Sequence, residues 1–194
     1  MKKYFTILLL LTIAGCSKQD SGELPFGNGS RYPHLTKTES DGLLVSWFEP
    51  VDSTIIGLFW SEFSNNEWLV KTLIYSSDHF FINWADFPSI FELNDSTLVS
   101  HWLEMSGKST YDYDVKVIHS TDRGKTWSEP ILPHRDGKHA EHGFVSFYKN
   151  ETHELEMVWL DGREMAGGHG HGSAGDMNLY TTSFDRDFKQ RHDI

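Results

Sequence analysis

The sequence is poor in cysteine and in basic residues, and both shortages narrow the functions it can have. Its 194 residues include one cysteine, so no disulfide bond can form within the chain. Lys and Arg number 17 against 28 Asp and Glu, which gives a formal net charge of −11. Nucleic acid is therefore not expected as a partner, because binding phosphate needs a basic surface. A neutral sugar or a small ligand is left open, and no cofactor is expected.

Apolar residues at helical spacing are also lacking from Arg31 onward. The chain instead holds short runs rich in β-branched and aromatic residues, each bounded by Gly, Pro, Asn, Asp or Ser, which is typical of an all-β protein. The runs are LLVSW (43–47), TIIGLFW (54–60), WLVKTLIY (68–75), STLVSHW (96–102), YDVKVIHS (113–120), GFVSFY (143–148), LEMVW (155–159) and MNLYTT (177–182).

These runs repeat along the chain. Trp47, Trp102 and Trp159 each close a run, at spacings of 55 and 57 residues. Three serines follow later runs at spacings of 59 and 63 residues: Ser61, Ser120 and Ser183. The repeats predict three units of about four short strands, somewhat longer than the roughly 40–50 residues of familiar propeller blades.

Three such units predict part of a β-propeller. Propellers usually close with about 4–8 blades, and an open set leaves sheet edges exposed. The sequence ends with FKQRHDI and offers no terminal strand to close a ring. We therefore expect that the chain is part of a longer protein, or that it pairs with something.

The N-terminus has the features of an exported lipoprotein. Lys2 and Lys3 precede a short apolar stretch, 5–13, which is too short to span a bilayer and fits a signal segment. Residues 13–16 (IAGC) resemble the bacterial lipobox, in which Cys16 becomes the lipidated N-terminus; a plain signal peptide with a chance cysteine is the alternative.

Several acyl chains on Cys16 would give stable anchoring. The lipobox and the polar stretch after it divide the chain into an expected signal peptide at 1–16, a polar tether at 17–30 (SKQDSGELPFGNGS) and the partial propeller at 31–194. The expected location is outside the cytoplasm, anchored to a bacterial membrane on the periplasmic or cell-surface side of the outer membrane.

One motif is specific enough to assign. STDRGKTW (120–127) matches the Asp-box, S-x-D-x-G-x-T-W, at every fixed position. The fixed residues are Ser120, Asp122, Gly124, Thr126 and Trp127. The Asp carboxylate can accept backbone N–H groups of a tight hairpin, Gly supplies a positive φ, and Trp packs over the strands. The motif therefore predicts scaffold, with SEFSNNEW (61–68) as a degenerate copy.

The Asp-box and further motifs resemble the sialidase superfamily of six-bladed propellers. Sialidases begin with an Arg-Ile-Pro motif, and SRYPHL (30–35) carries Arg31 and Pro33, with Tyr32 in place of Ile. More narrowly, three stretches resemble an uncharacterised bacterial group of sialidase-like proteins. They are NWADFPS (83–89), PHRDGKHAEHGFVS (133–146) and WLDGREMAGGHG (159–170). The resemblance covers residues 31–188, the N-terminal half of such a propeller.

The resemblance implies a site for an acidic sugar. Sialidases hold the sugar carboxylate with three arginines, and Arg31 matches the first; a surface arginine before a proline turn is the alternative. Arg163, in a turn close to the family pattern, is a further substrate-binding candidate. Asp52 is the nearest match by position to the general acid. The catalytic Tyr–Glu pair and the later arginines of the family would lie beyond Ile194.

Three acids follow the repeated tryptophans by two residues: Glu49, Glu104 and Asp161. If each unit is a blade, they gather at one end of the channel, where close carboxylates raise each other's pKa or bind a cation or a sugar. The alternative is that they are solvated turn residues.

Two loops are rich in histidine, at 134–142 and 167–176. The first contains His134, His139 and His142, and the second contains His169, His171 and Asp176. A His-x-His pair near an Asp can bind zinc, but flexible glycine-rich loops bind metal poorly, so a long binding loop is favoured and no metal is assigned.

The loop at 83–89 offers a sugar-binding pair. Trp84 can stack on a sugar ring, with Asp86 accepting hydrogen bonds from its hydroxyl groups; a core position for Trp84 is the alternative. Two functions follow from the sequence. The first is a sialidase-type exo-glycosidase acting on a glycan, possible only with residues absent from this chain, and the second is a non-catalytic surface propeller that binds glycan or protein.

Overall fold

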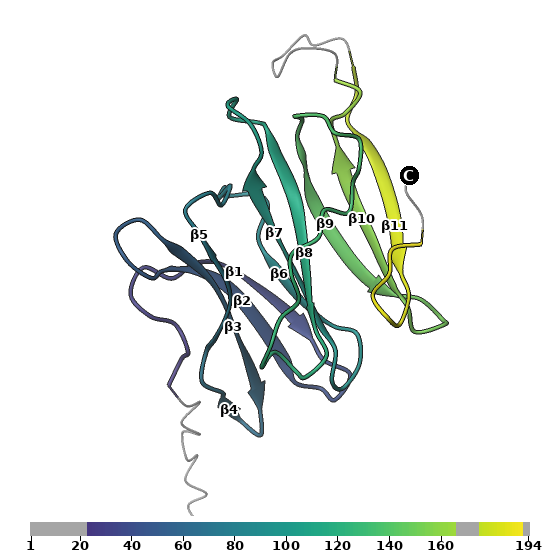
Figure 1. Ribbon diagram of the computed structural model, residues 1–194. Coiled ribbons are helices and arrows are strands. Elements are labelled where there is room, and N and C mark those ends of the chain that lie inside the picture. The colour runs from purple at the N-terminus through teal and green to yellow at the C-terminus, as the bar shows by residue number, and fades with distance from the viewer. Residues whose placement is uncertain (1–22, 166–174, 192–194) are drawn as a thin grey trace, which may run out of the picture.

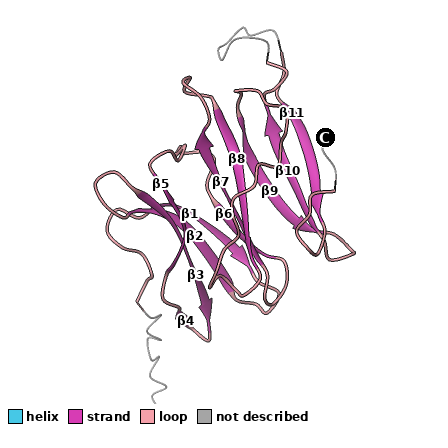
Figure 2. Ribbon diagram, in the orientation of Figure 1, coloured by secondary structure: helices cyan, strands magenta, loops and turns pink. Residues whose placement is uncertain are grey.

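The computed structural model describes residues 23–165 and 175–191, and within these residues every regular element is a β-strand (Figure 2). The strands of the first sheet are β1 (Arg31–Lys37), β2 (Leu43–Pro50), β3 (Ile56–Ser64), β4 (Glu67–Trp68) and β5 (Thr72–Ser77). Those of the second are β6 (Ser89–Glu92), β7 (Leu98–Met105) and β8 (Tyr113–Ser120). Those of the third are β9 (His142–Lys149), β10 (Leu155–Asp161) and β11 (Asn178–Phe184). The predicted all-β fold is confirmed.

Each sheet is an antiparallel meander, and the three sheets lie side by side in chain order (Figure 1). The first sheet has the order β1-β2-β3-β4, with β5 also paired to β3. The second and third have the orders β6-β7-β8 and β11-β10-β9. Three consecutive meanders facing one another are the blades of a propeller.

The fourth strand expected in each unit is complete only in the first sheet. In the second it is reduced to one bridge between Val117 and Ile131, and in the third to one between Phe184 and Gln190. Pro130 and Pro133 flank Ile131 and have no N–H group to donate, so a longer ladder cannot form there.

The core consists of two apolar layers, one on each side of the second sheet. Because side chains alternate along a strand, β7 sends Leu98 and Trp102 toward the first sheet and Val99 and Leu103 toward the third. The layer against the first sheet also contains Leu44, Phe48, Leu58, Trp60, Ile74, Ile90 and Ile118. The layer against the third contains Tyr113, Val115, Val117, Leu155, Met157, Trp159 and Phe184. The three repeated tryptophans are all fully buried.

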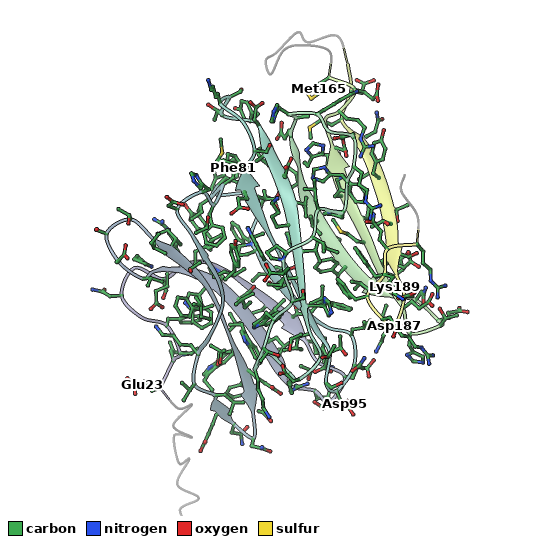
Figure 3. All side chains as sticks on the ribbon, in the orientation of Figure 1. Glu23, Phe81, Asp95, Met165, Asp187 and Lys189 are labelled. Atoms are coloured by element: carbon green, nitrogen blue, oxygen red, sulfur yellow. The ribbon has the colours of Figure 1, made fainter. Side chains whose placement is uncertain are left out.

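The blades have two distinct ends. Phe81 and Met165 lie at one end and Asp95, Asp187 and Lys189 at the other (Figure 3). We call the first the loop end, because the long connections at 78–88 and 132–141 reach it, and the second the hairpin end.

STDRGKTW forms a turn at the hairpin end, where Arg123 N donates to the carbonyl of Ser96 at 2.7 Å. The carboxylate of Asp122 accepts three hydrogen bonds inside the turn, from Thr126 N at 2.8 Å, Thr126 Oγ1 at 2.6 Å and Ser120 Oγ at 2.8 Å. These bonds hold the pKa of Asp122 down, at about 2.

Gly124 is required in this turn for two reasons. Its φ is +78°, and a Cβ at this position would lie 2.3 Å from Cζ2 of Trp60, which belongs to the neighbouring blade. Trp127 packs against the same apolar layer as Trp60. The hairpin thus links two blades.

The other two blades have their own versions of the turn. In the first, Asn65 and Asn66 both have positive φ, which is the geometry of a type I′ hairpin turn. In the third, Asp185 accepts the N–H groups of Asp187 and Lys189 at 3.0 and 2.9 Å, much as Asp122 does. The repeat in the sequence identifies Ser183 before this third turn but does not identify Asp185.

The packed region begins before Arg31. Phe26, expected to lie in the polar tether, packs edge-to-face on Trp47 with ring centroids 4.9 Å apart. Residues 1–22, with the signal segment and Cys16, lie outside the described residues. In the parts described, 23–165 and 175–191, no helix has the length and hydropathy of a membrane span.

Candidate functional site

The three stretches that resemble the bacterial sialidase-like group meet at the loop end. The backbone N–H of Phe144 donates to Oδ2 of Asp86 at 2.5 Å, joining the second stretch to the first. Nε of Arg163 lies 3.0 Å from Oδ2 of Asp136, joining the third to the second. Residues 58 and 27 positions apart in the sequence are therefore in contact, and the region where the three stretches meet is the candidate site.

The first stretch presents an aromatic ring to solvent. Oδ1 of Asn83 accepts the N–H groups of Ala85 and Asp86, both at 2.8 Å, which folds residues 83–86 into an Asx turn. Trp84 occupies the tip of this turn and is 83% exposed. The structure therefore places Trp84 on the surface and not in the core.

Asp86, two residues further, has the opposite environment. Its side chain is buried, with the residue 8% exposed. The pKa of Asp86 is raised to about 6, chiefly by burial; the hydrogen bond from Phe144 opposes the rise, and the charge of Glu141 adds to it. Gly143 is needed beside it, because a Cβ there would lie 2.3 Å from Oδ2 of Asp86.

Glu141 is held by a tyrosine. The hydroxyl of Tyr113 donates to Oε1 of Glu141 at 2.7 Å, and Phe81 stacks on the Tyr113 ring with centroids 3.9 Å apart. Burial, followed by the hydrogen bond to Glu141, raises the pKa of Tyr113 above its ordinary value, so the phenol keeps its proton. Tyr113 is therefore not activated as a nucleophile.

Two predicted substrate-binding residues, Asp161 and Arg163, bind each other. Nε and Nη2 of Arg163 donate to the two oxygens of Asp161 at 2.9 and 2.6 Å, and Trp159 Nε1 donates to Oδ2 at 2.8 Å. Burial alone would raise the pKa of Asp161, but these hydrogen bonds keep it below its usual value. The Arg163 guanidinium also lies 3.9 Å over the ring of Tyr180.

A pair of buried histidines supports this arrangement from the second stretch. The rings of His134 and His142 stack with centroids 3.8 Å apart and 5° between their planes. Nε2 of His142 lies 3.0 Å from Asp136 Oδ2, and its Nδ1 lies 3.2 Å from the carbonyl oxygen of Tyr113. Both ring nitrogens thus face oxygen atoms that can accept hydrogen bonds.

His134 is held in the neutral form. Its Nε2 accepts the N–H of Val115 at 3.3 Å, and burial lowers its pKa to about 3. The sequence had identified both histidines only as members of a flexible loop. The structure gives them fixed positions beneath the loop end.

Neither acid–histidine group in this region has good metal geometry. His134, His142 and Asp114 offer ligand atoms close together, but imidazole binds metal in its ring plane, and two stacked parallel rings cannot share one ion. In the group of Asp136, His142 and Asp161, the guanidinium of Arg163 already holds both carboxylates. His169 and His171 lie outside the described residues, and Asp176 is exposed.

The acids after the other two tryptophans also accept hydrogen bonds from the chain. Glu49 accepts hydrogen bonds from Gly27 N at 2.9 Å, Ser30 Oγ at 2.8 Å and Trp47 Nε1 at 3.1 Å, and pairs with Lys71. Burial opposes its ionisation, but these contacts bring its pKa down to about 2.

Glu104, in the second blade, accepts from Ser77 Oγ at 3.0 Å. The indole-to-acid bond of Trp47 and Trp159 is not repeated there, and Trp102 Nε1 has no hydrogen-bond partner among the described residues. The three acids thus occupy equivalent strand positions, and each makes its contacts separately.

Arg31 and Asp52 lie toward the first blade. Arg31 is exposed at the start of β1, beside a small cavity of about 130 Å³ lined by Phe26, Ser30, Pro33 and Trp47. Asp52 closes the β2–β3 turn, where Oδ1 accepts the N–H groups of Thr54 and Ile55 at 2.8 Å each. These bonds lower the pKa of Asp52, the opposite of what a general acid needs, so its catalytic role stays a prediction without structural support.

Comparison with known proteins supports the fold. No family model and no curated protein matches the chain. It is similar to the α-L-arabinanase of Penicillium chrysogenum solved with arabinobiose, at 13% identity and a TM-score of 0.55, over 82% of this chain and 49% of that one. The GH93 α-L-arabinofuranosidase of Fusarium graminearum, also with arabinobiose, matches at 14% and 0.51 over 80% and 46%.

A thermostable family-43 glycoside hydrolase matches at 14% identity and a TM-score of 0.52, over 86% of this chain and 59% of that one. The chain thus spans about half the length of the first structures it matches. Identities this low show the fold alone, and the predicted partial β-propeller is confirmed. These structural relatives are glycoside hydrolases other than sialidases.

Proposed function

We propose that the loop end of this propeller binds a carbohydrate, and that the chain forms part of a glycoside hydrolase-type propeller. The observation that carries the proposal is the 83% exposure of Trp84 on a turn fixed by Asn83. An indole face costs free energy to leave in water, and it can cover the C–H face of a sugar. A turn that fixes the backbone beneath this ring lowers the entropy lost on binding.

The choice of sugar rests on two different supports. The similar arabinanase and arabinofuranosidase were both solved with arabinobiose, which supports a neutral pentose glycan. Arg31, exposed beside the cavity next to Trp47, supports an acidic sugar of the sialic acid type instead. Arabinobiose and 3′-sialyllactose are therefore the two probes.

The test is calorimetric titration of both sugars into the purified protein and into Trp84→Ala. Removing the ring should weaken binding by at least about 10-fold, equivalent to about 1.4 kcal/mol. Val70→Ala is the matched control, because Val70 is another exposed apolar side chain, on the link between β4 and β5. Equal affinities for wild type and Trp84→Ala would remove the proposal.

A second candidate is a binding propeller without catalysis. Glu49 and Asp161, two of the acids expected at the site, already have their carboxylates engaged by donors of the chain. Such carboxylates are poor nucleophiles and poor acids. Sugar binding with no hydrolysis of aryl arabinosides or sialosides would favour this candidate.

We further propose that the protein is exported and anchored through lipid on Cys16, on the basis of the Lys2–Cys16 sequence alone. Cys16→Ser should leave the protein in the soluble fraction of the producing cells. A mutant that is still processed at the same bond and still sediments with membranes would exclude the lipid anchor.

A further inference from the structure

The carboxyl group of Asp86 is satisfied on only one side. Oδ2 accepts the N–H of Phe144 at 2.5 Å. Oδ1 has no hydrogen-bond partner among the described residues, although the residue is only 8% exposed. Oδ1 is not fully buried and keeps contact with solvent, but burial of the rest of the carboxyl group costs the charged form more free energy than the neutral acid. The side chain thus has the environment of a neutral acid.

The groups that face Asp86 reinforce this state. Glu141, from the segment before β9, carries a negative charge that opposes a second one nearby. Tyr113, from β8, is a neutral phenol. Its hydroxyl group donates its hydrogen bond to Oε1 of Glu141 at 2.7 Å, so it donates none to Asp86. The pKa of Asp86, about 6, agrees with this geometry.

We propose that Asp86 donates a hydrogen bond from its protonated carboxyl group to an oxygen atom of the sugar that Trp84 covers. This inference rests on the proposed carbohydrate site and assigns its polar contact. The two residues lie two positions apart in one turn, 83–86, and the proposal requires that a ring stacked on Trp84 extends to Asp86. Asp86 was expected from the sequence to accept hydrogen bonds from sugar hydroxyl groups, and the proposal reverses this role.

The proposal predicts that binding depends on pH in one direction. The acid form binds, so affinity for the probe should be constant below the pKa and fall by up to about 10-fold per pH unit above it. Titrations of arabinobiose and 3′-sialyllactose from about pH 5 to about pH 8 measure this. Trp84→Ala, measured in parallel, identifies binding at the proposed site.

Two substitutions at Asp86 separate the donor role from folding. Asp86→Asn keeps an oxygen for Phe144 and gains an N–H donor, so its affinity should equal that of the wild-type acid form and no longer depend on pH. Asp86→Ala removes the donor and should bind weakly at every pH. Glu141→Gln removes the neighbouring charge and should move the midpoint of the wild-type pH dependence to lower pH.

Each outcome decides between the two ideas. Binding that needs Trp84 but does not change with pH, or that is lost in folded Asp86→Asn, would overturn the donor role and leave the carbohydrate site standing. If neither sugar binds, or binding does not need Trp84, both fail. Carbon-13 NMR of the Asp86 carboxyl gives an independent check, since a midpoint near 4 with the sugar absent would also overturn the proposal.

Discussion

Arg163 donates two hydrogen bonds, of 2.6 and 2.9 Å, to the carboxylate of Asp161, which is fully buried. The pair closes the third blade at the loop end, where Asp161 also accepts the indole N–H of Trp159. Two side chains expected to bind substrate are therefore part of the support beneath the site.

Removing the arginine should destabilise the fold. Arg163→Ala would leave the buried charge of Asp161 without its partner, a change that typically costs about 3–5 kcal/mol in the free energy of unfolding. Urea denaturation measures the loss, with Lys125→Ala as a control at an exposed cation. A loss below about 1 kcal/mol, the level of a surface ion pair, would show that the pair is not structural.

The Asp-box turn should make the protein sensitive to acid. The pKa of Asp122 is lower in the folded state than in the unfolded chain, so its contribution is present above about pH 4 and is lost as the pH falls toward about 2. Asp122→Ala should lower the melting temperature at pH 7 and lose the acid dependence of this window. Asp122→Asn, which keeps one acceptor, should have a melting temperature between those of Asp122→Ala and the wild type. An Asp122→Ala protein as stable as the wild type would contradict the role of the carboxylate in the turn.

The buried neutral His134 should also make the protein less stable as the pH falls, in a range above that of Asp122. Burial lowers the pKa of His134 to about 3, whereas the unfolded side chain titrates near 6.5. The unfolded state therefore binds the proton first, and stability should fall as the pH drops below about 6.5, by up to about 1.4 kcal/mol per pH unit.

His134→Gln keeps an acceptor for Val115 and should flatten this dependence. His79→Gln, at an exposed position, is the control and should leave it unchanged. The measurement is the free energy of unfolding between about pH 4 and about pH 7. Equal slopes for the His134 variant and the wild type would mean that His134 is not held neutral.

Hydrolysis of sialosides by this chain is not expected. A sialidase-type site stabilises its transition state with several arginines, yet Arg163 is engaged by Asp161 and Asp136, and Arg123 by Glu62 and Glu92. Arg31 offers one guanidinium group, which can make one bidentate contact with a sugar carboxylate. A fluorogenic sialoside assay measures this, and turnover that disappears in Arg31→Ala would contradict the expectation.

Local sequence patterns predicted the scaffold better than the site. Alternating apolar runs predicted the strands, and the fixed residues of STDRGKTW predicted a turn, because both depend on neighbouring residues. The first-blade turn was also identified as a hairpin with different chemistry, and Asn65 and Asn66 provide it.

The network beneath the site depends on residues that are distant in the chain. Glu141 and the stacked rings of His134 and His142 acquire their roles only when the segment before β9 meets β8 and β10. No spacing in the sequence indicates such a meeting. Trp84 and Asp86 were identified as a pair because they lie in one short stretch, but only the burial of Asp86 beside Glu141 in the folded chain favours its protonated form.

Carbohydrate binding at the loop end can be tested by NMR mapping of the bound sugar. Nitrogen-15 spectra recorded with increasing arabinobiose, and separately with 3′-sialyllactose, report which residues the ligand contacts. We expect shifts concentrated at the Trp84 indole and at residues 83–88 and 141–144, with the signals of residues 120–127 at the opposite end unchanged. Shifts confined to the hairpin end, or none with either sugar, would contradict it.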